Sequence, residues 1–299
     1  MQNQTDIIAS TVLGKKVKGS ETYDSSLLVA VPREENRQKY NINSNKLPFE
    51  GRDIWHAYEF SAMTTNGIPV TRVLKLNYNC DNAYLIESKS LKLYLNSFNM
   101  SKFGKNITEC LEICKSKIEN DLSLKLQTDV KIEFLDNNAP KYEIFKNFKN
   151  IMNFINEEEI SIKNFKESPE LLEVVDTENE STYNLSFDSL RSNCRITHQP
   201  DFGDLFLYYK SKKHITEQSL VKYLTSFRSE YHFHEECCEM IFKRLYDLFD
   251  PNDELMVCAL YTRRGGIDIC PVRYSKNCTF DEFKILTDIT KFARHGIKQ

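Results

Sequence analysis

Cys194 and Asp201 lie seven residues apart in the stretch SNCRITHQPDFGD, residues 192–204. Cysteine attacks as a thiolate, and its reactivity depends on neighbouring charges and hydrogen bonds. The apolar and polar residues before Cys194 alternate, which favours a strand, while Pro200 and Gly203 predict a turn that contains Asp201. Such a junction could place the thiol and the carboxyl group over one pocket. A small buried cysteine followed by a turn aspartate would have the same spacing.

A second group of reactive side chains is YHFHEECC, residues 231–238. His232, His234, Cys237 and Cys238 are all zinc-ligand types. Neighbouring positions on a helix point about 100° apart, so the two cysteines cannot both face one ion with both histidines. The alternative is that Phe233 packs in the core and that the two glutamates favour a helix start because of the macrodipole.

The nine glycines include no dinucleotide-binding fingerprint and no phosphate-binding loop. A bound dinucleotide would therefore be held by side chains and helix N-termini. The candidates are Ser88 and Lys89 at a predicted helix start and Arg264 with Gly265 at a predicted late turn. Each of these could equally be a solvated cap or turn.

The elements that position these residues form two similar units. Asn66-Gly67 predicts a hairpin turn within residues 58–79. Helices are predicted over 86–98 and 105–122, followed by a strand over 130–135. The second unit has strands around Cys194 and over 205–210, helices over 215–227 and 233–248, and a final hairpin around residues 263–266. IESKSLKLYLNSF and ITEQSLVKYLTSF, which start the two helix pairs, are identical at seven of thirteen positions. This internal duplication predicts two similar α+β domains.

Length and composition limit the class of protein. A chain of 299 residues favours one or two domains. The net charge of −3 provides no basic field for nucleic acid. No apolar run reaches the roughly 18 residues that span a bilayer, and the N-terminus lacks a signal-peptide layout. Nine cysteines without framework spacing predict reduced thiols in a cytosolic enzyme. We expect residues 1–50 to pack on the first domain as an extension and Cys110 and Cys114 to pack in a helix core.

Four motifs together resemble the NADPH-dependent 7-cyano-7-deazaguanine reductases of queuosine biosynthesis. They are IESKSLKLYLNSF, SNCRITHQPDFGDL, FHE at 233–235 and YTRRGGIDICPVR, and ESKSLKLY is close to the signature octapeptide of the family. The duplicated organisation is similar to the longer, bimodular subfamily. The resemblance covers about residues 50–135 and 185–275. Phe202 departs from the tryptophan that is usual in related sequences, which concerns the shape of the site.

The resemblance implies an α+β protein with two tandem tunnelling-fold domains, each an antiparallel sheet with a helix pair on one face. We expect an N-terminal domain over 1–140, an acidic connector over 141–185 and a catalytic domain over 186–299. The implied reaction reduces a nitrile to a primary amine with two NADPH and no metal. A cytoplasmic homodimer, a small deazapurine substrate, and no direct contact with nucleic acid or membrane are also implied.

The resemblance also implies roles for individual residues. Cys194 would attack the nitrile carbon to form a covalent thioimide, Asp201 would supply the proton, and His234 would assist proton transfer or activate the thiol. Glu87 and Glu235 would accept hydrogen bonds from the deazaguanine ring, and Phe233 would cover its face. The remaining substrate contacts would come from Ile86, Ser88 and His234, and NADPH would be held by Ser88, Lys89, Arg264 and Gly265.

Two other functions stay open from the sequence. A zinc-dependent purine or pterin cyclohydrolase of the same fold would carry stoichiometric metal. A non-catalytic binding module would have Cys194 as an ordinary core residue, which should not react quickly with iodoacetamide.

Overall fold

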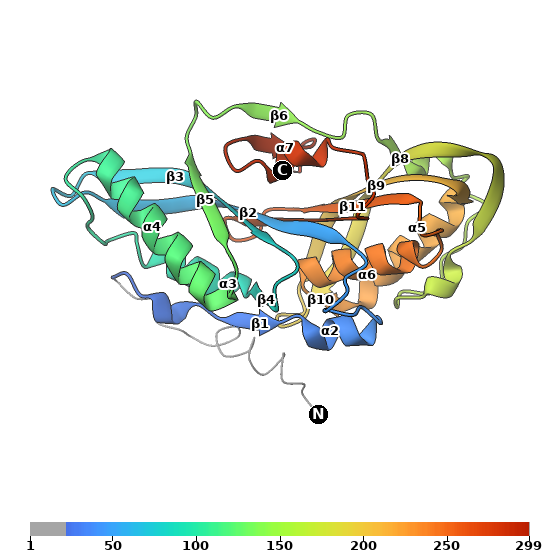
Figure 1. Ribbon diagram of the computed structural model, residues 1–299, viewed down its shortest axis with the longest axis horizontal. Helices are drawn as coiled ribbons and strands as arrows, with labels where there is room; N and C mark the ends of the chain where they lie inside the picture. The colour runs from blue at the N-terminus through green and yellow to red at the C-terminus, as the bar shows by residue number, and fades with distance from the viewer. Residues whose placement is uncertain (1–21, 299) are drawn as a thin grey trace.

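One nine-stranded sheet runs through the computed structural model, which describes residues 22–298 (Figure 1). Eight of its strands follow the order β10 (Tyr231–His232), β8 (Val174–Cys194), β9 (Pro200–Ile215), β11 (Glu254–Tyr261), β12 (Ile267–Tyr274), β2 (Glu50–Met63), β3 (Pro69–Asn79) and β5 (Val130–Leu135). The ninth, β7 (Lys149–Asn150), pairs with β8. The pairs that β8 makes with β10 and β7 are parallel, and the other pairs are antiparallel.

The two halves of the chain contribute their elements in the predicted order. The first half contains β2, β3, α3 (Ser88–Asn96), α4 (Ile107–Leu126) and β5, and the second contains β8, β9, α5 (Glu217–Ser226), α6 (His234–Tyr246), β11 and β12. The predicted α+β class and the extra strand of the second half are confirmed. Strands β12 and β2 pair from Ile267–Ala57 to Tyr274–Glu50, so the sheet is continuous across the halves. The predicted acidic connector, residues 141–185, overlaps β8, which begins at Val174.

Each helix pair buries an apolar stripe against the strands of its own half. Leu91, Tyr94 and Leu95 of α3 are buried with β2 and β3. Their counterparts in α5 are buried with β8, β9 and β11, because the duplicated sequence repeats the same helical spacing. Cys110 and Cys114 are fully buried in the stripe of α4, which confirms core packing.

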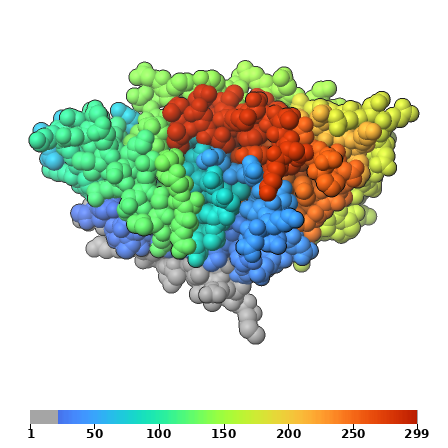
Figure 2. Space-filling view, in the orientation of Figure 1, coloured from blue at the N-terminus to red at the C-terminus, as the bar shows by residue number. Residues whose placement is uncertain are grey.

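The opposite face of the sheet is covered by the connector and the C-terminal segment. Every residue of β11 is buried, and Met256 and Cys258 pack with Phe145 of the connector and Phe283 of α7 (Phe283–Thr287). The strand β13 (Phe292–Arg294) pairs in parallel with β6 (Lys141–Glu143). Figure 2 shows the C-terminal segment, in red, next to the light green connector. The sequence patterns did not predict this second layer.

The described part of the N-terminal extension contacts both halves. It contains β1 (Ala30–Pro32), which pairs with β4 (Tyr84–Ile86), and α2 (Glu34–Lys39), which packs against α6. The prediction of packing on the first half alone was therefore too narrow, and residues 1–21 lie outside the described range. Short 3-10 helices lie at Ser25–Leu27, Ile151–Phe154, Pro169–Leu171 and Phe227–Ser229.

Two predicted glycine turns are confirmed. Gly67 has a φ of 84° between β2 and β3, and Gly265 and Gly266 have φ of 60° and 82° between β11 and β12. These left-handed conformations favour glycine because it has no Cβ. Within residues 22–298, no helix combines the length and the apolar character needed to cross a membrane.

Candidate active site

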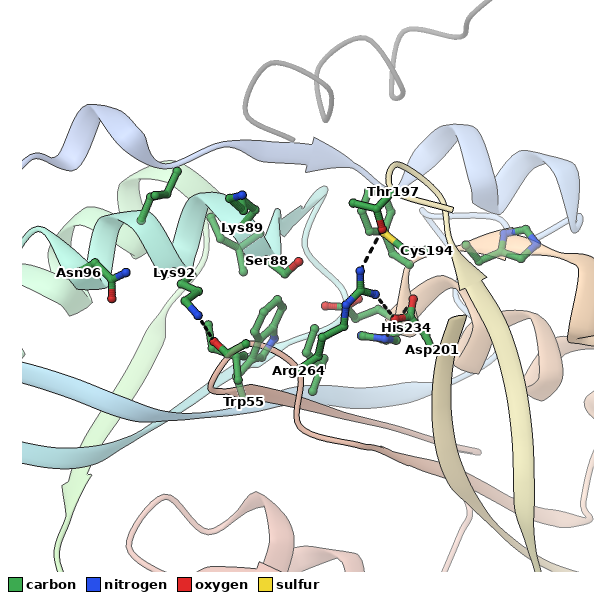
Figure 3. Close-up of a pocket in the computed structure, with 18 residues that line it drawn as sticks. Trp55, Ser88, Lys89, Lys92, Asn96, Cys194, Thr197, Asp201, His234 and Arg264 are labelled. Carbon is green, nitrogen blue, oxygen red and sulfur yellow. Dashed lines mark hydrogen bonds and ion pairs between the residues drawn. The ribbon is translucent and has the colours of Figure 1, made fainter. Parts of the chain in front are cut away.

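A cavity of about 300 Å³ lies where β12 pairs with β2 (Figure 3). Its apolar walls include Trp55 from β2 and Ile267 and Ile269 from β12. The start of α3 forms one side, and the end of β8 and the start of α6 form another. The remaining lining residues are Ile86, Ser88, Lys89, Lys92, Leu93, Asn96, Cys194, Thr197, Asp201, His232, Phe233, His234, Glu235, Arg264 and Gly265. The cavity thus takes residues from both halves of the duplication.

Cys194 ends β8 at the cavity, and the turn that follows differs from the predicted one. The turn occupies residues 195–199, where Cys194 donates its backbone N–H to Gln199 O at 2.8 Å and His198 has a φ of 57°. Pro200 opens β9, so Asp201 lies in a strand opposite Ser192 and not in a turn. Proline is tolerated at the first position of a strand, where no ladder hydrogen bond is lost. The hairpin register brings Cys194 and Asp201 to the same cavity.

Cys194 differs from the other eight cysteines, all of which are described. Seven of these are buried, and burial raises the pKa of the Cys237 thiol to about 12. Cys278 is partly exposed, but burial also raises its pKa, to about 11, and it does not line the cavity. A high pKa leaves little thiolate at neutral pH. Cys194 is the partly exposed thiol that faces the cavity, so it is the one placed to act as a nucleophile.

Asp201 is held between two basic side chains. His234 Nε2 lies 3.5 Å from Asp201 Oδ2, and the Arg264 guanidinium donates to Oδ1. Burial raises the pKa of Asp201, but His234 and Arg264 outweigh it and hold that pKa below its usual range. Asp201 is therefore a carboxylate at neutral pH.

Arg264 is held by hydrogen bonds at the cavity mouth. It donates to Asp201 and to the side-chain oxygens of Thr197 and Gln199, as Figure 3 shows for the contacts with Asp201 and Thr197. Thr197 and Gln199 belong to the turn after Cys194, and sequence reasoning did not identify either of them. A ligand phosphate that binds Arg264 must compete with these three partners.

Glu235 and Phe233 are buried residues of the cavity lining. Glu235 is 1 % exposed, and its Oε1 accepts no hydrogen bond from the described residues. Burial and the neighbouring Asp53 carboxylate raise the pKa of Glu235 to about 8, against the attraction of Arg33 and Arg273. An unpaired buried acceptor is costly in free energy, so this oxygen fits a ligand that brings N–H donors.

Glu87 has a structural task that the sequence did not reveal. It is the N-cap of α3, and its two carboxylate oxygens accept the backbone N–H groups of Lys89 at 2.9 Å and Ser90 at 2.6 Å. Burial raises its pKa. Glu87 is fully buried and does not line the cavity, unlike its neighbours Ile86 and Ser88. These two N–H groups of α3 are also not free for a phosphate, contrary to the expectation of a helix N-terminal site.

Basic side chains of α3 remain available for an anionic cofactor. Lys89 and Lys92 lie one turn apart, which puts them on one face of α3, and both line the cavity. Lys92 also donates to Gly265 O, which joins α3 to the turn that carries Arg264. Sequence reasoning missed Lys92 and Asn96, although their spacing from Lys89 by three and seven residues was a usable signal. The set of Ser88, Lys89, Lys92 and Arg264 fits phosphate groups.

The cysteines and histidines of residues 231–238 do not gather around one point. Cys237 and Cys238 are buried in the core of the second half, while His234 packs on Tyr261 with ring centroids 3.9 Å apart. Among residues 22–298, the group whose potential ligand atoms lie within 4.8 Å of one another is His56, Asp268 and Cys270, none of which lines the cavity. The geometry therefore agrees with the argument against zinc at 231–238.

The chain is similar to known proteins over most of its length. A family profile described as "Nitrile reductase, 7-cyano-7-deazaguanine-reductase N-term" matches residues 20–134, and one described as "QueF-like protein" matches residues 200–279. The chain is also 38 % identical over 279 residues to a curated NADPH-dependent 7-cyano-7-deazaguanine reductase of Colwellia psychrerythraea. That alignment covers 92 % of this chain and 94 % of the relative.

Proposed function

Because the chain belongs to the NADPH-dependent 7-cyano-7-deazaguanine reductase family and is a nitrile reductase, we propose that it reduces 7-cyano-7-deazaguanine through a thioimide on Cys194. The observation that carries the proposal is the exposure of this one thiol to a cavity beside the pair of Asp201 and His234. Two tandem tunnelling-fold units, joined at β12 and β2, form the scaffold that we propose for it. The repeated element order of the two halves supports this assignment.

The first proposed step joins Cys194 Sγ to the nitrile carbon, while the thiol S–H bond breaks and its proton passes to the Asp201–His234 pair. One C–N π bond breaks, and the nitrogen takes a proton to give the thioimide. Asp201 then delivers that proton to the nitrogen, and His234, whose Nε2 lies 3.5 Å from the carboxylate, assists the transfer. Covalent capture divides a difficult reduction into easier steps because a nitrile accepts hydride poorly.

Two hydrides complete the proposed reaction. The thioimide carbon would take a hydride from NADPH and, after the carbon–sulfur bond breaks to give an imine, the imine carbon would take a second hydride from another NADPH. Each addition requires one proton at nitrogen, so the Asp201–His234 pair must be recharged from solvent between the steps. Cys194 returns as a free thiol when the carbon–sulfur bond breaks. The product is the primary amine 7-aminomethyl-7-deazaguanine.

The residues of the cavity divide into two proposed binding regions. Glu235 accepts the N–H donors of the base, and Phe233 covers its ring. Ile86, Ser88 and His234 complete that region. Ser88, Lys89, Arg264 and Gly265 hold NADPH, and Lys92 adds a further cation on the same face of α3. Glu87 caps α3, and we propose that its carboxylate also accepts N–H donors of the base.

Three measurements test this function. Oxidation of NADPH followed at 340 nm should require the nitrile base and should consume two NADPH for each amine formed. Enzyme incubated with the base and without NADPH should gain the mass of one whole substrate molecule, because addition to a nitrile expels no leaving group. A chelator should leave activity unchanged, whereas loss of activity that zinc restores would favour the cyclohydrolase alternative.

A further inference from the structure

Glu235 lies on α6 close to a buried network of charged side chains. It is one helical turn before Glu239 on α6, and residues four apart lie on the same helix face. Glu239 accepts hydrogen bonds from Arg37 Nε at 2.8 Å and from Arg273 Nη2 at 2.9 Å. Burial raises the pKa of Glu239, but the guanidiniums outweigh it and lower that pKa to about 2. Glu239 thus has ion-pair partners for both of its oxygens, whereas Oε1 of Glu235 accepts no hydrogen bond from the described residues.

Arg33 connects this network to the N-terminal extension. It follows β1, is 2 % exposed, and forms an ion pair with Asp53 of β2. Its Nη1 lies 3.4 Å from Glu239 Oε1, and its Nε donates to Asn82 Oδ1 at 3.2 Å. Arg273 also reaches Asp53, with Nη2 and Oδ1 2.8 Å apart. The extension therefore places a cation beside Asp53 and Glu239.

The extension also packs on the residue proposed to cover the base. Val31 of β1 and Leu85 of β4 are fully buried in one apolar cluster with Phe233. Val31 is two residues before Arg33. One short segment thus supports Phe233 with its apolar side chain and reaches Asp53 with its charged one.

The charges of the network become balanced when Glu235 ionises. Arg33, Arg37 and Arg273 carry three positive charges, and Asp53 and Glu239 carry two negative charges. A buried charge excess is costly, so the remaining positive charge favours a further carboxylate nearby. Glu235 is the buried acid in position to supply it.

We propose that Arg33, which the N-terminal extension contributes, is a positioning residue of the substrate region that stabilises the carboxylate form of Glu235. This inference rests on the proposed function of Glu235 as the acceptor of N–H donors from the base. Only the carboxylate accepts at both oxygens, whereas a protonated carboxyl group would present an O–H to a donor. Arg33 thereby adjusts how strongly the base binds, although it does not line the cavity.

The inference makes base binding dependent on pH in a defined direction. The charged groups that act on Glu235 are Asp53 of β2, Arg33, and Arg273 of β12, with Glu239 on its own helix and Tyr78 of β3 nearby. The pKa of Glu235 in the empty cavity is about 8, so below that pH the base must displace a proton as it binds. Binding should therefore strengthen as the pH rises towards 8 and become constant above it.

Calorimetric titration of the nitrile base into a Cys194→Ala variant measures this step without covalent capture. In this background the dissociation constant should fall by about fiftyfold between pH 6 and pH 8, with release of about one proton at pH 6. Arg33→Met should move the midpoint upward by about one pH unit or more, which weakens binding at pH 7 by about tenfold. Arg33→Lys, which keeps the charge, should restore most of the wild-type midpoint.

Asp53→Asn provides a second variant with the opposite sign. Removing this carboxylate should lower the midpoint and strengthen binding at pH 7, a result that damage to the fold does not produce. Arg244→Met is the matched control, because Arg244 pairs with Glu167 and contacts none of the acids around Glu235. In a Glu235→Gln background, Arg33→Met should no longer change the pH dependence of base binding.

Unchanged midpoints in both Arg33→Met and Asp53→Asn would overturn the inference, even if binding were uniformly weaker. If Arg33→Met does not fold, the direction of the shift in Asp53→Asn decides the matter. Failure of the base to bind the Cys194→Ala protein at any pH would instead contradict the proposed function, so the two ideas can fail separately.

Discussion

Replacing Glu235 by glutamine should make the empty enzyme more stable while it weakens binding of the base. Burial raises the pKa of this carboxyl group to about 8, so the folded protein holds the proton more tightly than the unfolded chain, where the ordinary value is 4.5. The free energy of unfolding of the wild-type enzyme should therefore decrease as the pH rises from about 4.5 to about 8. This contribution is constant above about 8, where both states are ionised.

The size of the effect follows from the two pKa values. They differ by about 3.5 pH units, and each unit corresponds to about 1.4 kcal/mol, so ionised Glu235 costs on the order of 5 kcal/mol. About half of this cost, roughly 2 to 3 kcal/mol, should develop between pH 5 and pH 7. That is a large part of a typical free energy of unfolding of about 5 to 15 kcal/mol. Glutamine does not titrate and avoids the cost.

Urea unfolding can be followed by the fluorescence of Trp55, which is the single tryptophan and is buried. The stability advantage of Glu235→Gln over wild type should grow by roughly 2 to 3 kcal/mol between pH 5 and pH 7 and level off above pH 8. Glu157→Gln, on the exposed part of the connector, controls for the chemical change. A difference that does not vary with pH would refute the reasoning, as would unchanged affinity of Glu235→Gln for the base.

Three further outcomes test the site and its scaffold. Cys194→Ala should abolish the mass increase with the nitrile base, whereas Cys237→Ala and Cys238→Ala should keep it, and an adduct that maps to any other cysteine contradicts the mechanism. Arg264→Ala should raise the Michaelis constant for NADPH by about tenfold or more, since a charge-assisted hydrogen bond contributes about 1.5 to 3 kcal/mol. An equal rise for the base counts against that role. Arg37→Met should lower the free energy of unfolding by about 3 to 5 kcal/mol in urea titrations, because it leaves Glu239 short of a buried partner, and a loss below about 1 kcal/mol would exclude that pairing as important.

Local patterns in the sequence were sufficient for the parts of the fold that depend on local geometry. The apolar spacing of α3 and α5 predicted which residues are buried, and Gly67, Gly265 and Gly266 predicted turns that need positive φ. The elements around the cavity followed from these patterns together with the family motifs. Their success reflects energies that depend on neighbours within about four residues.

The turn after Cys194 was predicted at the wrong residues because the conformation of this segment depends on contacts with residues that are distant in the sequence. A Cβ on Gly203 would lie 3.2 Å from Leu260 O and 3.2 Å from the ring of Tyr261. Glycine is thus favoured there by the close approach of β11 and not by a turn. The burial of Arg33 and Arg37 was not predictable from the local sequence either, since Arg37 pairs with Glu239, 202 residues later. A polar, irregular extension gives no local sign that its arginines will be buried.

The duplicated helices α3 and α5 have similar sequences but lie in different surroundings. Aligned on their shared motif, Lys89 and Lys92 of α3 correspond to Gln218 and Val221 of α5. The apolar stripe is the same in both helices, but Lys92 lines the cavity, whereas Val221 is buried in a core that includes Ile151 of the connector. Lys89 and Lys92 of α3 line the same cavity as Cys194 and Asp201, which the other half supplies. The pairing of β2 with β12 joins the two halves at this cavity. Each half therefore supplies one part of the cavity lining, and the proposed chemistry requires both halves in one sheet.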